Sequence, residues 1–199
     1  MYTGDTRMTS KLKTDVLETV SGSGTIALTN QLSGMTADSV PSGSVLQVVS
    51  ATKSDTQSVT GMTWTDVAGL AVSITPSSTS SKILVSVGIN MSSTLRYAAF
   101  KMLRGSTEVG VGDAAGNRPR ISGGTSSNVN STGDLYLIHN SNAQYLDSPA
   151  TTSATTYKVQ FTNTTYVNAV THVNRSTADA NENYGPRGIS TITLTEIKG

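Results

Sequence analysis

The segment KILVSVGIN, residues 82–90, decides the fold class of this chain. Within it, aliphatic residues at every second position alternate with smaller or more polar ones, namely Ile83, Val85, Val87 and Ile89 with Leu84, Ser86, Gly88 and Asn90. Successive side chains of a β-strand point to opposite faces of a sheet. The alternation therefore predicts a strand with one face buried and one face open.

Similar segments occur on both sides of residues 82–90, separated by turn residues. The further expected strands are 45–49, 56–60, 67–74, 95–103, 107–111, 135–139, 156–162, 166–173 and 189–197. The first of these is so dense in valine and leucine that we expect it to be buried on both faces. Almost no helical pattern follows residue 42. The spacing predicts an all-β domain over residues 43–199, a jelly-roll-like β-sandwich.

The composition supports a β-rich domain and excludes several classes of function. The 199 residues include 28 serines, 31 threonines and 18 glycines, with 14 basic and 13 acidic residues and no cysteine. A net charge of +1 argues against a nucleic-acid-binding protein, and no apolar run is long enough for membrane insertion. The chain starts without a secretory signal pattern, and it has no nucleotide-binding loop or metal-ligand spacing. We therefore expect no cofactor and no metal.

The first 42 residues differ from the rest and are interpreted as an N-terminal attachment arm and linker. Met8, Leu12 and Val16 recur every four residues with Leu17 beside them, which is compatible with one face of a short helix. An extended, flexible tail is the alternative, and the sequence does not separate the two. The arm is charged and carries these four apolar anchors, and Ser21–Gly24 then breaks the pattern. Such a layout suits a module that docks onto a larger assembly.

Two polar loops are the candidate binding sites of the domain. The first, 112–133, concentrates polar side chains between glycines: Asp113, Asn117, Arg118 and Arg120. The second, 174–188, contains Arg175, Tyr184 and Arg187. Arginine and carboxylate groups form bidentate hydrogen bonds, which suits sugar hydroxyls or carboxylates. The structural alternative is that Asp113 pairs with Arg118 across the loop or between subunits.

An enzymatic function is not expected. Glycan hydrolysis needs two positioned carboxylates, and nucleophilic catalysis needs a nucleophile beside a base. No spacing of the available acidic residues places two of them as such a pair. Asp147, which lies two residues before Pro149, is interpreted as a turn former.

A thin core makes association of chains plausible. The chain has one tryptophan and two phenylalanines, and many strand positions hold serine, threonine or alanine. Contacts between subunits would bury further apolar area. The strands at 45–49 and 95–103 are the candidates for these contacts, and both are equally compatible with ordinary core strands.

Six turn-and-strand motifs carry a resemblance to a known family. They are GTIALTNQLSG (24–34), SGSVLQVVSATKSDT (42–56), WTDVAGLAVSITPSSTSSKILVSV (64–87), RGSTEVGVGDAAGNR (104–118), YLDSPATTSATTYKVQF (145–161) and YGPRGISTITLTEIKG (184–199). On these motifs the chain resembles small β-rich modules of tailed bacteriophages, especially marine ones, which are similar to trimeric jelly-roll tips of the tumour-necrosis-factor type. The resemblance covers most of the chain from residue 24 onward and contains no catalytic motif.

The resemblance implies a non-enzymatic virion structural protein, made in the host cytoplasm. It implies a homotrimeric tail-fibre tip or appendage, attached to other virion proteins through the arm, whose two loops contact host cell-surface polysaccharide or protein. The alternative is a capsid decoration or head-fibre protein that stabilises the shell. A secreted carbohydrate-binding module is a third reading, and the missing signal pattern counts against it.

Overall fold

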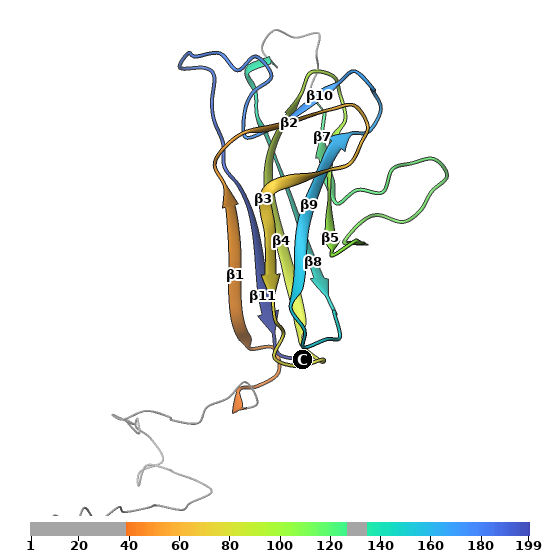
Figure 1. Ribbon diagram of the computed structural model, residues 1–199, viewed down its shortest axis with the longest axis vertical. Helices are drawn as coiled ribbons and strands as arrows, with labels where there is room; N and C mark the ends of the chain where they lie inside the picture. Colours follow the sequence, from red (N-terminus) through yellow and green to blue (C-terminus); the bar gives the residue numbers. More distant parts are fainter. Residues whose placement is uncertain (1–38, 127–134) are drawn as a thin grey trace, which may run out of the picture. The chain divides into compact units, whose positions relative to one another are not determined.

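The computed structural model describes residues 39–126 and 135–199, and the described part of the chain contains β-strands and no α-helix (Figure 1). The strands are β1 (Val45–Lys53), β2 (Gln57–Thr60), β3 (Thr65–Ile74), β4 (Lys82–Ser93), β5 (Ala98–Arg104), β6 (Thr107–Val109), β7 (Gly123–Thr125), β8 (His139–Asp147), β9 (Thr155–Asn163), β10 (Val170–Val173) and β11 (Ser190–Ile197). The expectation of an all-β domain is confirmed. The proposed helix or tail and its anchors Met8, Leu12, Val16 and Leu17 lie outside the described residues.

The strands form two antiparallel sheets. In sheet A the order is β1-β11-β4, with β8 on the other edge of β4 and with β10 and β2 continuing the sheet at the end of β4. Sheet B has the order β3-β9-β5, and β5 pairs along its outer edge with β6 and β7. A tight turn at residues 104–106 joins β5 to β6, with Gly105 at φ 59°.

The pairing of the strands follows the nested order of a jelly roll. The first long strand pairs with the last, β1 with β11, and the next pairs inward are β3 with β9, β4 with β8, and β5 with β6 and β7. The outer and third pairs belong to sheet A and the other two to sheet B. A long hairpin of paired strands folded over itself produces this alternation between two sheets. The jelly-roll-like topology is therefore the arrangement that the structure contains.

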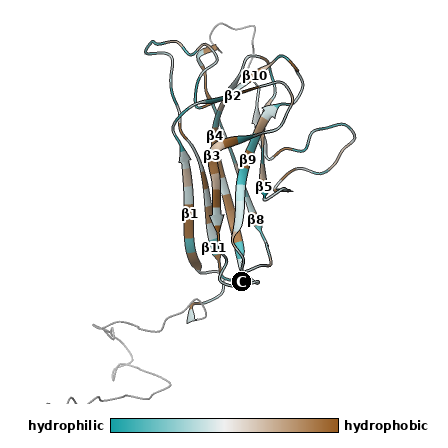
Figure 2. Ribbon diagram, in the orientation of Figure 1, coloured by the Kyte–Doolittle hydropathy of each residue, from teal (hydrophilic) through white to brown (hydrophobic). Residues whose placement is uncertain are grey.

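The core lies between the two sheets and follows the alternation seen in the sequence. Ile83, Val85, Val87 and Ile89 of β4 are buried, and Leu84 and Ser86 between them are partly exposed on the other face. The buried partners from the opposite sheet include Leu70 and Ile74 of β3 and Phe161 of β9. Figure 2 shows the resulting bands of brown and paler colour along the strands. Burial of one face of each strand is the main stabilising contribution to the sandwich.

Several expectations about individual strands are wrong in detail; for example, the segment 166–173 is a strand only from Val170 onward. The segment 45–49 belongs to an edge strand, and Val45 and Val48 are 60% and 57% exposed instead of buried on both faces. Residues 135–138 are not a strand, because β8 begins at His139 and extends through Asp147. The segment 95–103 contributes a strand only from Ala98 onward.

Candidate functional site

The first predicted binding loop, represented by residues 112–126 of the described chain, projects away from the sandwich beside β5 (green in Figure 1). Asp113, Asn117, Arg118 and Arg120 are all exposed. Hydrogen bonds within the loop hold it: the backbone nitrogen of Gly112 donates to the carbonyl of Ile121 at 3.3 Å, and the side-chain Nε of Arg120 donates to the carbonyl of Gly112 at 2.7 Å. No ion pair joins Asp113 to Arg118 within the described residues, so the structural alternative of a pair across the loop is not observed.

The second predicted loop, 174–188, is organised by an aspartate of the loop itself. Asp179 accepts from Arg175 at 3.0 Å and from Arg187 at 2.6 Å, so the two predicted arginines converge on one carboxylate. Tyr184 is exposed and its ring packs edge-on against Tyr136, with 4.9 Å between the ring centroids. This cluster stabilises the conformation of the loop. The solvent-facing side of Arg187 and the ring of Tyr184 stay accessible to a binding partner.

The two predicted loops do not form one site. Residues 112–120 extend from the sheet B side next to β5, and residues 174–188 (dark blue) lie at the end of the sandwich beyond β1 in Figure 1. The seven predicted residues therefore make two separate polar surfaces.

A buried histidine lies beneath the 174–188 loop. The Nδ1 of His172 is 2.7 Å from the Oγ of Ser58, and its Nε2 has no hydrogen-bond partner among the described residues. Burial, and secondly the positive charge of Arg175, lower the pKa of His172 to about 4, against a smaller opposing effect of Asp179. His172 is therefore neutral near pH 7, and its protonation would place a charge under the loop.

The outer face of sheet A is almost free of charge. Read across its four long strands, neighbouring outward positions form rows of aliphatic, hydroxyl and amide side chains: Val48, Thr195, Leu84 and Leu146; Ser50, Thr193, Ser86 and Gln144; Thr52, Thr191, Gly88 and Asn142. Lys82, at the end of the face, is the single charged side chain among the outward positions of these strands in the described part of the chain. We call these rows, with Lys82, the sheet A face.

The outer face of sheet B is charged by contrast. Lys158 of β9 pairs with Asp66 of β3 at 2.8 Å, and Lys101 of β5 pairs with Glu108 of β6 at 2.7 Å. The Nζ of Lys101 also lies 4.4 Å from the ring centroid of Trp64. The Lys158–Asp66 pair is of the kind that a solvated sheet surface carries, whereas Lys101 is buried.

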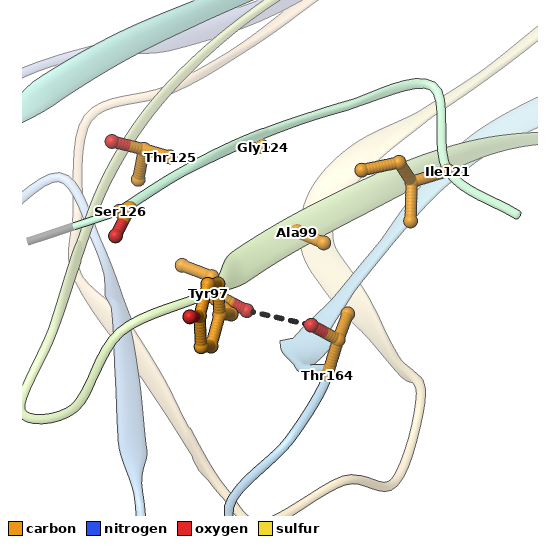
Figure 3. Close-up of a pocket in the computed structure, with 8 residues that line it drawn as sticks. Tyr97, Ala99, Ile121, Gly124, Thr125, Ser126 and Thr164 are labelled. Atoms are coloured by element: carbon orange, nitrogen blue, oxygen red, sulfur yellow. Dashed lines mark hydrogen bonds between the residues drawn. The ribbon is translucent and has the colours of Figure 1, made fainter. Parts of the chain in front are cut away.

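A hollow at the start of β5 was not predicted from the sequence (Figure 3). It has a volume of about 320 Å³ and is lined by Tyr97, Ala98, Ala99, Ile121, Gly124, Thr125, Ser126 and Thr164. Figure 3 shows the Tyr97 ring beside Thr164, with Thr125 and Ser126 on the neighbouring segment. We call it the Tyr97 pocket. Its residues come from three distant segments, and no local motif in the sequence marks them.

The buried carboxylates are occupied by structural partners. Asp147, expected to be a turn former, ends β8 inside the fold, where it accepts from Tyr157 at 2.6 Å and pairs with Arg104 at 2.7 Å. Burial first, and then Asp147, raise the pKa of the Tyr157 hydroxyl far above its usual value. Within the described residues no cluster of three or more metal-ligating side chains occurs, and no helix there has the length and apolarity to span a membrane.

In comparisons with known proteins, no family model and no curated protein sequence matches this chain.

Proposed function

We propose that this chain is a non-enzymatic structural protein of a bacteriophage virion, a homotrimeric fibre or appendage subunit. In this proposal the arm attaches the subunit to other virion proteins, and the loops of the β-domain contact the host surface. The resemblance of the six segments to phage modules supports the setting. The observation that carries the proposal within the domain is the sheet A face, whose outward positions in the described chain include a single charged side chain.

The sheet A face has the chemistry of a surface between subunits. The cores of protein interfaces are depleted of charged side chains, and the positions on this face fulfil that condition from β1 across to β8. Val48 is more than half exposed and Leu146 nearly half. Association of copies through this face would remove these side chains from water. No charged side chain of the three rows would have to be buried. The trimeric state itself is taken from the resemblance.

The remaining surfaces suit contact with a host. The loops 112–120 and 174–188 extend from other parts of the domain than the sheet A face, so association through that face leaves them accessible. Arg118, Arg120 and Tyr184 are exposed and carry donors and an aromatic ring, which are common in recognition surfaces.

The oligomeric state and the location of the chain test this proposal. Chromatography with light scattering on the full chain at micromolar concentration is expected to give a trimer. Immunogold labelling of particles is expected to place the chain at the tail, with few copies per particle. Labelling spread over the head, with many copies, would replace the appendage by the shell-stabilising decoration protein.

The host-contact role has a separate test. The purified, fluorescently labelled protein is expected to bind to host cells and to compete with particles for adsorption. A chain that assembles correctly but never binds to cells, in particles that infect normally without it, would remove the receptor-binding role.

A further inference from the structure

We propose that the Tyr97 pocket binds a neutral sugar ring. This inference deepens the proposed function and rests on it for its biological setting, since an appendage that contacts a host polysaccharide needs a saccharide site. Part of its lining, Ile121 to Ser126, belongs to the first predicted loop, 112–133, but none of the seven predicted binding residues is among the lining residues.

One lining residue of the pocket, Tyr97, belongs to a stacked pair of exposed aromatic rings. Tyr97 is 43% exposed and Tyr166 is 38% exposed, and their rings are stacked with centroids 6.3 Å apart and planes 16° apart. Two large rings left open to water side by side offer apolar area together with two hydroxyl groups. Tyrosine supplies such contact area at a low cost in side-chain entropy.

A fully buried amide holds the two tyrosine loops in place. The side-chain nitrogen of Asn163 donates to the carbonyls of Leu95 and Arg96, directly before Tyr97. Its oxygen accepts from the backbone nitrogens of Thr165 and Tyr166. One side chain therefore fixes both loops from inside the fold. A ligand that touches both rings does not have to order them first, which favours binding.

The backbone of Tyr97 is strained in the conformation that presents the ring. Its φ is 71°, in the left-handed region that bulky residues rarely adopt. Its carbonyl accepts from both the backbone nitrogen and the hydroxyl of Thr164, and these bonds hold the strained residue in position. A strained backbone conformation of this kind persists where several surrounding contacts together fix it.

The lining of the pocket matches the two sides of a pyranose. Ala99 and Ile121 offer apolar surface to the C–H face of a sugar. Thr125 and Ser126 contribute hydroxyl groups that make no hydrogen bond within the described residues, so they are available to sugar hydroxyls. Among the described residues that line the pocket no side chain is charged, and this favours a neutral saccharide over an acidic one.

The pocket stays open in the proposed trimer. Every lining residue belongs to sheet B or to a segment that directly adjoins one of its strands. None belongs to the sheet A face, so association through that face and sugar binding do not compete.

The test is titration of the isotopically labelled full chain with neutral monosaccharides, followed by NMR. The panel contains glucose, galactose, mannose, fucose and N-acetylglucosamine, with N-acetylneuraminic acid as the acidic comparison. We expect at least one neutral sugar to shift the methyl signals of Ala98, Ala99 and Ile121. The acidic sugar is expected to bind more weakly.

Tyr97→Gly is the decisive variant, because it removes the ring while glycine accepts a φ of 71° without strain. We expect it to keep its thermal stability and to bind about tenfold more weakly, which corresponds to about 1.4 kcal/mol. Tyr166→Ala is expected to weaken binding as well. Val167→Ser is the matched control, since Val167 is 77% exposed on the same loop and does not line the pocket.

The outcomes separate this inference from the proposed function. If no neutral sugar shifts the pocket signals, or if Tyr97→Gly binds as well as the unchanged chain, the sugar site is wrong. If sugars bind in the pocket but cells never capture the protein, the site stands and the host-contact role falls. If cells capture Tyr97→Gly and the unchanged chain equally, host contact stands and does not use this pocket.

Discussion

The outer faces of sheets A and B come from strands of the same alternating type, yet they differ in charge. The face of sheet B carries two ion pairs, Lys158 with Asp66 and Lys101 with Glu108. The sheet A face carries Lys82 alone among its outward positions in the described chain. A sheet face with exposed ion pairs is suited to contact with water, and we propose that the face without them contacts further copies of the chain.

The largest expected effect comes from placing a carboxylate on the sheet A face. Thr193→Glu or Val48→Glu would bury one charge per subunit at the proposed interface. We expect the association constant to fall by at least about 100-fold, which corresponds to about 3 kcal/mol. Light scattering across a concentration series measures this fall.

Ser73→Glu is the matched control for this experiment, because Ser73 is exposed on the outer face of sheet B. It is expected to leave the oligomer intact. If both faces tolerate glutamate equally, the contrast between them has no role in association.

The next largest effect concerns the inner side of sheet A. Glu196 is fully buried, and it accepts from Gln47 at 2.6 Å and from the backbone nitrogen and hydroxyl of Ser77 at 2.7 and 2.6 Å. Burial alone would raise the pKa of this carboxyl, but the hydrogen bonds from Ser77 and Gln47 lower it overall. Glu196→Ala leaves these donors unpaired, and we expect a loss of about 3 kcal/mol in the free energy of unfolding.

Urea unfolding at fixed protein concentration measures this loss. Glu196→Gln keeps an acceptor at the same place and is expected to lose less. An alanine variant as stable as the unchanged chain would show that Glu196 does not tie the turn at Ser77 to sheet A.

Acid provides the third way to disturb sheet A. The pKa of His172 is lowered to about 4 in the folded chain, against 6.5 for an unperturbed histidine. Below pH 6.5 this histidine becomes protonated in the unfolded chain. In the folded chain it stays neutral until about pH 4. Stability therefore falls as the pH falls across this window, by up to about 3 kcal/mol.

The check is urea unfolding at a series of pH values between 7 and 4 for the unchanged chain and for His172→Gln. The variant is expected to lack this part of the acid dependence. Identical slopes for the two chains in that window would contradict the prediction.

The smallest effect is expected on sheet B. The side chain of Asp66 is about half exposed, and hydrogen bonding to Lys158 is the main cause that lowers its pKa. Exposed ion pairs contribute little, so Asp66→Asn is expected to cost less than about 1 kcal/mol and to leave association unchanged. Calorimetry measures the stability of this variant, and light scattering measures its association. A larger effect than expected would show that sheet B takes part in assembly.

The strand pattern was largely predictable, and its failures have physical causes. The segment 82–90 alternates because its strand has one buried face, and β4 confirms the expectation. The valines of 45–49 indicated a doubly buried strand, but hydropathy alone does not distinguish a core strand from an exposed strand at a sheet edge. The strand β8 was predicted to end near its actual start, because its exposed asparagines resemble a loop.

The candidate sites were predictable only in part. Glycine-rich and arginine-rich segments indicated exposed loops, and Arg118, Arg120 and Tyr184 are exposed. The convergence of Arg175 and Arg187 on Asp179 depends on the folded path of the loop. Asp147 was interpreted from its neighbour Pro149, but its hydrogen bond to Tyr157 and its ion pair with Arg104 connect β8 to sheet B.

The sequence by itself determined that this chain is a β-protein with few charges and two polar loops, because side-chain alternation and turn chemistry are local properties. Only the tertiary structure decided which outward positions lie side by side, because neighbours across a sheet are set by register between distant strands. That register gathers the uncharged residues on the sheet A face and the ion pairs on sheet B. It also brings Tyr97 and Tyr166 together over Asn163. No local pattern in the sequence predicts this contact.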